Sequence, residues 1–191
     1  MEKHYLVKTS APFDPTLLFT LLAEAGIDTR TISFSSPTEA EFVAPVSFYA
    51  ELYQLLKPFH DDIGGSVSIL IAHQHTAFEQ RLLDEALAYF PNSCVFPSDV
   101  IMKEVGYDNY DSYGPLMDLF RPIAGDFDLL EAAKAYLACG LDACLAAKTL
   151  FVHRNTFSYR LNAFVEKTGV DIRDYHNALL FEIYLQFKGK R

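Results

Sequence analysis

The chain has 191 residues, of which 16 are Lys or Arg and 25 are Asp or Glu, so its formal net charge is −9. Half of the residues are hydrophobic, which excludes a disordered or collagen-like chain because such chains cannot bury a core. An acidic total also argues against nucleic acid, whose phosphates repel acidic surfaces, unless the average hides a local basic face. At roughly 150 residues per domain, the length favours one large domain or two small ones.

The N-terminal segment and the cysteines indicate a compartment. Residues 1–10 lack the apolar stretch of a signal peptide, and no run approaches the ~18 apolar residues of a membrane helix. Cys94, Cys139 and Cys144 are odd in number and form no CxxC pair, so neither a disulfide framework nor a cysteine metal site is indicated. We therefore expect a cytoplasmic protein with reduced thiols and no membrane partner.

The first two thirds of the chain alternate between helical and strand-like patterns. Apolar residues recur at helical spacing in three segments, residues 17–25, 48–59 and 78–90, the second ending near Pro58. Short strand-like segments lie at residues 32–34, 42–44, 67–72 and 94–96. The apolar run 67–72 predicts a strand buried on both faces, and the helix that follows it leads to another strand, as in a βαβ unit. We expect an α+β or α/β domain over residues 1–121.

A connecting region and a helical domain follow. Residues 106–125 are rich in turn formers and predict one short helix at 116–120. Beyond residue 126 every clear signal is helical, with Asp128 and Glu131 resembling a capping box. The helix boundaries are expected at Gly140, Asp142, Gly169 and Asp174. These signals predict an all-α domain over residues 126–191.

The spacing within residues 143–168 predicts a helix-turn-helix motif, a short helix and a longer helix joined by a turn of about three residues. Ala146 and Ala147 supply the small side chains that a close helix crossing needs. Val152 and Phe157 are expected to fill the angle between the helices, and His153 stands where the N-cap of the second helix belongs.

The second helix of this motif carries side chains that suit DNA. Such helices enter the major groove by their first turn, here Arg154, Asn155 and Thr156. Arginine pairs with guanine, asparagine pairs with adenine, and threonine bonds phosphate or contacts a thymine methyl group. Further contacts are expected from the outward-facing or flanking side chains of the motif, which are Lys148, Ser158, Tyr159, Arg160 and Asn162.

The charge distribution supports DNA as the partner. Residues 126–191 carry nine basic and eight acidic side chains, whereas residues 1–125 carry seven and seventeen. From Lys148 to Lys167 there are four basic residues and one acidic residue, Glu166. The acidity of the chain therefore belongs to the N-terminal domain.

The last third of the chain resembles a known family. Residues 128–131 read DLLE, 135–137 read AYL, 146–161 read AAKTLFVHRNTFSYRL, and 168–172 read TGVDI. This pattern resembles the C-terminal helix-turn-helix of the PucR/CdaR transcription regulators of bacteria. Ala146 departs from the threonine that is common there. The family's usual upstream region is much longer, and its GGDEF signature is missing, since residues 61–65 indicate only a turn. The resemblance implies a shortened, degenerate GGDEF-like domain over residues 1–121.

Nothing in the sequence indicates catalysis, a metal or a cofactor. His73 and His75 alternate on one face of the strand-like segment that begins at 67, and His60 is followed by two aspartates. A metal site needs three or four converging ligands, so surface histidines are the expected interpretation. No phosphate loop, nucleophile elbow or Cys–His pair is present.

The sequence thus predicts a cytoplasmic, non-enzymatic bacterial transcription regulator that binds double-stranded DNA. We expect a homodimer on half-sites ~34 Å apart or a multiple of that, with an N-terminal domain that senses a small-molecule effector or dimerises. The alternatives are a protein-interaction module that has lost DNA binding and a small α/β enzyme with an appended helical domain.

Overall fold

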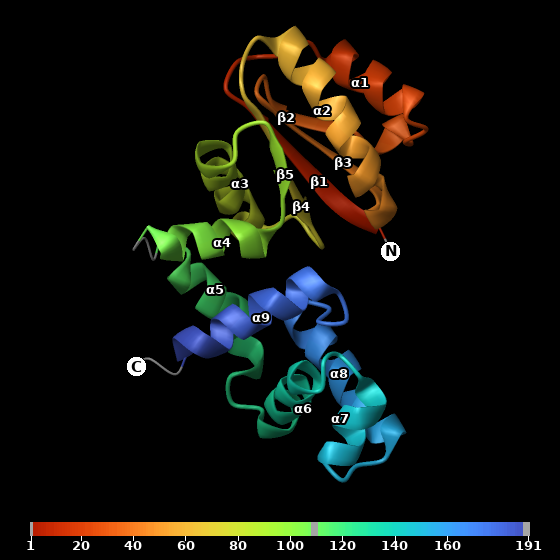
Figure 1. The fold of residues 1–191 in the computed structure, drawn as a ribbon, viewed down its shortest axis with the longest axis vertical. Coiled ribbons are helices and arrows are strands. Elements are labelled where there is room, and N and C mark those ends of the chain that lie inside the picture. The colour runs from red at the N-terminus through yellow and green to blue at the C-terminus, as the bar shows by residue number, and fades with distance from the viewer. Residues whose placement is uncertain (1, 108–110, 189–191) are drawn as a thin grey trace. The chain divides into compact units, whose positions relative to one another are not determined.

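The computed structural model describes residues 2–107 and 111–188, and the chain divides into two compact units, residues 1–109 and residues 110–191. We call them the α/β unit and the helical unit (Figure 1). The first combines a five-stranded sheet with helices, and the second is all helical in its described part. This confirms the predicted fold class. No helix in the described ranges is long and apolar enough to cross a membrane.

The sheet of the α/β unit has the strand order β2-β3-β1-β4-β5. Its strands are β1 (Glu2–Thr9), β2 (Ser33–Ser36), β3 (Glu39–Pro45), β4 (Val67–Ala72) and β5 (Ser93–Val95). Neighbouring strands are antiparallel except β4 and β5, which are parallel and joined by α3 (Ala77–Tyr89). The predicted βαβ unit is therefore confirmed, as is the burial of every residue of β4.

Helices cover both faces of this sheet. The described part of the unit has four α-helices, α1 (Pro15–Glu24), α2 (Tyr49–Ile63), α3 and α4 (Pro97–Gly106), and two 3₁₀ turns, η1 (Thr29–Thr31) and η2 (Val46–Phe48). Tyr5 and Ile69 belong to the core cluster that α1 and α2 complete. Because side chains alternate along a strand, the buried Leu6 and Leu70 face the opposite side, where α3 packs on β1 and β4.

The helix around Pro58 is longer than predicted. It continues through Pro58 to Ile63 and ends at Gly64, whose φ of +64° is the left-handed conformation that suits glycine at a helix end. The prediction that it ends near Pro58 is wrong because the buried stripe of Leu52, Leu56 and Phe59 extends past the proline and holds the helix together. Residues 61–63, expected in a turn, form its last turn.

His73 and His75 do not lie on a strand, so that prediction is wrong. β4 ends at Ala72, and both histidines follow it. The His75 ring is bonded at Nδ1 to Glu41 Oε2 (2.8 Å) and at Nε2 to Gln80 Oε1 (2.9 Å). His4 Nδ1 lies 2.5 Å from the other oxygen of Glu41. Across residues 2–107 and 111–188, no cluster of three or more His, Cys, Asp or Glu side chains is arranged to hold a metal ion.

The His75–Glu41 pair makes the stability of the α/β unit depend on pH. Burial opposes protonation of the ring, but the hydrogen bonds to Glu41 and Gln80 outweigh it and raise the pKa of His75. A raised pKa gives a contribution that is complete below the unfolded pKa of ~6.5 and is lost as pH rises through the folded value. Burial also raises the pKa of Glu79, which acts in the same direction.

We expect His75→Gln to flatten this pH dependence. Between about pH 6 and pH 8 the wild-type chain should lose more free energy of unfolding than the variant. The difference should stay below about 1 kcal/mol, because the pair is partly exposed and screened by solvent. Urea titrations at a series of pH values measure the effect. Identical slopes for the two proteins would show that the pair adds no pH dependence.

The helical unit contains α5 (Tyr113–Phe120), η3 (Arg121–Ile123), α6 (Phe127–Ala138), α7 (Ala143–Thr149), α8 (Arg154–Thr168) and α9 (Tyr175–Lys188). Phe120, at the end of α5, joins the helices because its ring centroid lies 6.2 Å from Phe164, 5.2 Å from Phe181 and 4.7 Å from Tyr184. α9 therefore packs into the core of its own unit. The sequence-based division between 121 and 126 separates α5 from the helices on which it packs.

Candidate nucleic-acid interface

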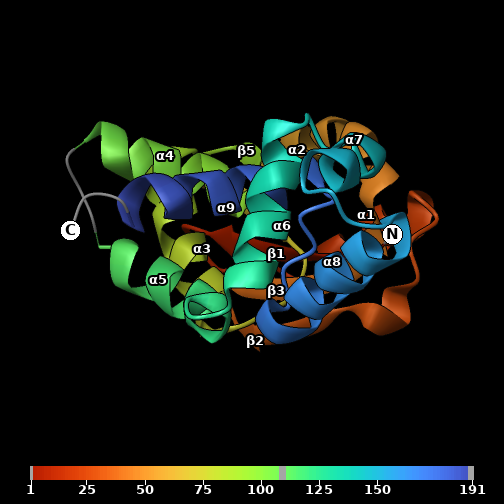
Figure 2. The same ribbon diagram turned by 90° about the horizontal axis from the view of Figure 1, so that it is seen from below.

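The helix-turn-helix consists of α7, a turn and α8, and both helices pack on α6 (Figure 2). Ala146 and Ala147 are buried on α7, and no side chain larger than a methyl group projects from these two positions. Phe157 is fully buried on α8, with its ring 6.2 Å from that of Tyr136 on α6. The two alanines and Phe157 are therefore buried, as their predicted packing roles require.

Local hydrogen bonds fix both ends of α7. Asp142 Oδ1 accepts from the backbone N–H groups of Cys144 (2.8 Å) and Leu145 (2.9 Å), as predicted for an N-cap. At the other end, the Val152 N–H donates to the Ala147 carbonyl (3.0 Å) and the Phe151 N–H to the Lys148 carbonyl (3.1 Å). This pair of bonds is a Schellman motif, which reverses the chain in a few residues.

His153 begins α8. Its Nδ1 accepts from the Asn155 N–H (3.2 Å), and its carbonyl accepts from the Phe157 N–H (3.0 Å). The predicted N-cap is therefore confirmed. Because Nδ1 is the acceptor, the proton of the neutral ring belongs on Nε2. α8 ends at Gly169, whose φ is +71°, also as predicted.

The predicted DNA-contacting residues fall into two groups. Six of them are exposed, with no intramolecular side-chain partner among the described residues: Lys148, Arg154, Asn155, Thr156, Ser158 and Tyr159. Arg160 is half-buried, and its guanidinium donates to Asp128 Oδ1 on α6 (2.8 Å). Asn162 is exposed and accepts from the Arg173 guanidinium (3.2 Å).

Ion pairs hold α8 against the start of α6. Arg160 pairs with Asp128, and two helical turns further along α8 Lys167 Nζ lies 2.9 Å from Asp126 Oδ2. The hydrogen bond from Lys167, with a second from the Leu129 N–H, lowers the pKa of Asp126. Asp126 is also the N-cap of α6, so the predicted capping role of Asp128 is wrong. Asp128 lies in the first turn instead, where its carboxylate reaches Arg160.

The surface formed by α7, the turn and the first two turns of α8 is basic. No Asp or Glu occurs between residues 143 and 165. Within the part of the chain that the structure describes, neither Lys148 nor Arg154 forms an ion pair. The sequence patterns did not single out Phe151, whose side chain is 96% exposed in the turn. An aromatic residue between two helices ordinarily indicates a core position, and only its place after a C-cap signals otherwise.

Parts of the chain are similar in sequence to known proteins. The chain is 31% identical over 104 residues to the carbohydrate diacid regulator of Escherichia coli K12, an alignment covering 51% of this chain and 27% of the relative. It is 38% identical over 53 residues to the uncharacterized protein YxkF of Bacillus subtilis 168, covering 28% of this chain and 18% of the relative. The chain thus spans less than a third of the length of either relative.

One solved structure covers the whole chain. The regulator of polyketide synthase expression from Bifidobacterium adolescentis aligns with 100% of this chain and 83% of its own, at 15% identity and a TM-score of 0.46. The family match is confined to the helical unit, where residues 129–187 match the PucR C-terminal helix-turn-helix domain. These residues contain α7 and α8 and nearly all of α6 and α9. Residues 129–187 of this chain are therefore similar to the PucR C-terminal helix-turn-helix domain.

Proposed function

We propose that this protein is a sequence-specific transcription regulator that places the N-terminal turns of α8 in the major groove of DNA. The observation that carries the proposal is the division of α8 into two faces. Phe157, Leu161 and Phe164 are buried on one face, whereas Arg154, Asn155 and Thr156 project from the opposite side without intramolecular partners in the described chain. Side chains that contact bases in a groove need this freedom.

Each exposed side chain has a matching chemical group on DNA. Arg154 presents the guanidinium that pairs with guanine O6 and N7, and Asn155 presents the amide that pairs with adenine N6 and N7. Lys148, Thr156, Ser158 and Tyr159 supply donors for phosphate oxygens. Arg160 and Asn162 contribute differently, because their partners Asp128 and Arg173 hold α8 in position.

The test uses a duplex selected from random DNA by the wild-type protein. Arg154→Ala should weaken binding to that duplex by about 1–3 kcal/mol and relax the sequence preference at one position, because the bidentate contact is lost. Fluorescence titration at fixed salt measures both effects. Asn155→Ala should relax a different position.

The matched control is Arg121→Ala, which removes the same charge from η3, outside α7 and α8. Its affinity should stay near that of the wild type. If Arg154→Ala and Arg121→Ala bind equally well, α8 does not contact bases as proposed. An absence of any salt-dependent affinity for duplex DNA would favour the alternative, a protein-interaction module that has lost DNA binding.

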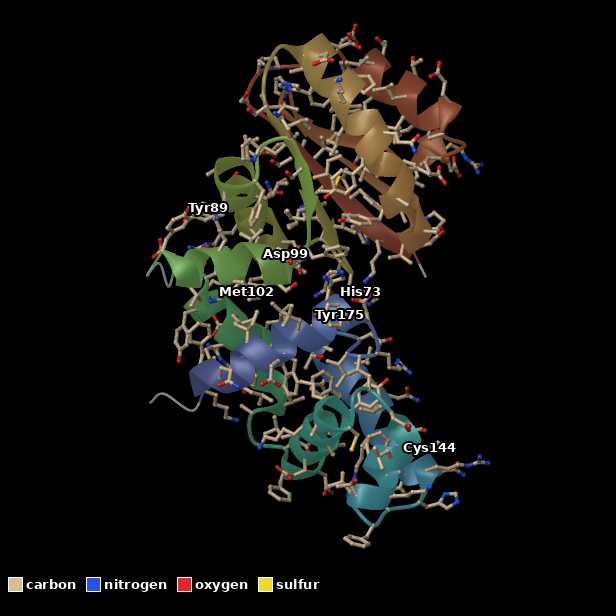
Figure 3. The ribbon with its side chains drawn as sticks, in the orientation of Figure 1. His73, Tyr89, Asp99, Met102, Cys144 and Tyr175 are labelled. Atoms are coloured by element: carbon tan, nitrogen blue, oxygen red, sulfur yellow. The ribbon has the colours of Figure 1, made fainter. Side chains whose placement is uncertain are left out.

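We further propose a homodimer in the bacterial cytoplasm, because one helix-turn-helix makes few base contacts and two half-sites ~34 Å apart multiply them. The α/β unit would then sense an effector or dimerise. We place the effector at a shallow, open depression beside β5, where aromatic and apolar side chains lie next to Asp99 and Lys103. It is lined by Tyr49, Tyr53, Phe90, Ser93, Cys94, Val95, Asp99, Met102 and Lys103. Asp99 and Met102 come from α4 (Figure 3).

Sedimentation of the full chain shows which unit forms the dimer contact. A dimer that persists after the α/β unit is destabilised places the contact in the helical unit, and a monomer places it in the α/β unit. Regulatory, non-catalytic function is part of the same proposal, and the regulator named among the relatives supports it.

A further inference from the structure

Phe151 has the most exposed large hydrophobic side chain in the described chain. It lies in the turn between α7 and α8, and 96% of its surface is in contact with solvent. A phenyl ring in water adds nothing to the hydrophobic stabilisation of the fold. The core therefore gives no reason for an aromatic residue at this position.

The backbone gives no reason either. The φ angle of Phe151 is +55°, in the left-handed region, and the residue occupies the position after the C-cap of the Schellman motif. Glycine adopts this conformation without steric cost and asparagine tolerates it, whereas other side chains are strained there. Both solvent exposure and conformation thus favour a small or polar residue, and the chain carries phenylalanine.

The neighbours of Phe151 indicate what the ring contacts. Lys148 lies one position before the C-terminal end of α7, Arg154 is the first residue of α8, and both cations are exposed. No acidic residue lies within eight positions on either side of Phe151. An apolar ring between two cations matches a surface that is anionic overall and has apolar groups between its charges. Duplex DNA is such a surface, with thymine methyl groups and deoxyribose carbons between its phosphates.

We infer that Phe151 is a DNA-contacting residue whose ring packs against a thymine methyl group or a deoxyribose beside the bases that α8 contacts. This inference rests on the proposed function, because the turn reaches DNA only if α8 enters the groove. In that geometry the turn directly precedes the end of α8 that lies against the duplex. The ring adds an apolar contact where Lys148 and Arg154 supply charge.

The experiment replaces Phe151 with asparagine, which keeps the left-handed backbone and removes the ring. Phe151→Asn should raise the dissociation constant for the selected duplex roughly tenfold, because the apolar contact is lost. Its thermal unfolding temperature should equal or exceed that of the wild type. The control is Phe127→Asn, which removes another exposed ring of the same unit and should leave the dissociation constant unchanged.

Uracil-substituted DNA identifies the contacted group. If uracil substitution weakens binding by the wild type but does not further weaken binding by Phe151→Asn, the ring contacts a thymine methyl group. If Phe151→Asn weakens binding and uracil substitution does not, the ring contacts deoxyribose. Both results support the inference. If Phe151→Asn binds like the wild type while Arg154→Ala is weakened, the inference is wrong and the proposed function stands. If the wild type binds no duplex, both are wrong.

Discussion

Replacement of Phe120 by alanine is expected to lower the free energy of unfolding of the helical unit by about 3–5 kcal/mol. The Phe120 side chain is fully buried, and its ring contacts those of Phe164, Phe181 and Tyr184. Truncation to alanine removes these contacts and leaves a cavity among three large aromatic rings. Three large side chains on two helices cannot readily collapse into that space, which places the cost at the high end for a core residue.

Chemical denaturation of the full chain, followed by hydrogen exchange resolved along the sequence, measures this effect. Protection should fall in α6, α8 and α9, because those helices share the core with Phe120. The control is Phe127→Ala, where the side chain is 75% exposed and the expected change is within about 0.5 kcal/mol. If the two variants are equally stable, α5 is not part of the helical core.

Leu70→Ala should destabilise the α/β unit by about 2–5 kcal/mol. Leu70 lies in β4, is fully buried, and pairs across the sheet with Leu6 of β1. The lost methyl groups leave a cavity between β4 and α3, whose buried side chains pack on this face of the sheet.

The same hydrogen-exchange measurement locates this second effect, which should appear in β1, β4 and α3. Met102→Ala is the control, since Met102 is exposed on α4 (Figure 3). Equal protection of β4 in the Leu70 and Met102 variants would contradict the expectation. Loss of protection confined to one unit in each of the Phe120 and Leu70 variants would also show that the two units unfold separately.

The helix-turn-helix could be predicted from sequence because its signals are local. The N-caps at Asp142 and His153 and the stop at Gly169 involve hydrogen bonds between residues two to four positions apart. Asp126 and Asp128 show the limit of such signals, since both suit a helix start. Asp128 forms an ion pair because the fold brings Arg160, 32 residues away, next to it. Rules that use only neighbouring residues cannot predict such a contact.

Non-local pairing also explains the elements that the sequence patterns did not indicate. β1 lies in the middle of the sheet, yet its apolar run is only Tyr5 to Val7. This segment is a strand because it pairs with β3 on one side and with β4 on the other. α4 begins at Pro97, and its capping bond runs from the Phe96 N–H to Asp99 (2.9 Å). Lys3 and Glu104 are buried in these elements, which reverses the usual meaning of a charged residue.

For the candidate site, helical periodicity predicted which face of α8 is buried, but not which exposed side chains are already occupied. Arg160 and Asn162 satisfy every sequence criterion for a DNA contact, and only the fold brings Asp128 and Arg173 to them. The exposure of Phe151 was equally hidden, because an aromatic residue between two helices is usually packed inside.

The number of residues in α7 determines the direction in which the chain leaves that helix. A residue in the left-handed conformation lies on each side of α7, Leu141 with φ +65° and Phe151 with φ +55°. These two positions fix where the seven-residue helix begins and ends. Each residue of an α-helix turns the chain by about 100°. One residue more or fewer in α7 would swing the exit of the helix by that angle relative to the buried face that carries Ala146 and Ala147. The direction in which α8 leaves the turn is therefore set by a residue count as much as by side-chain chemistry.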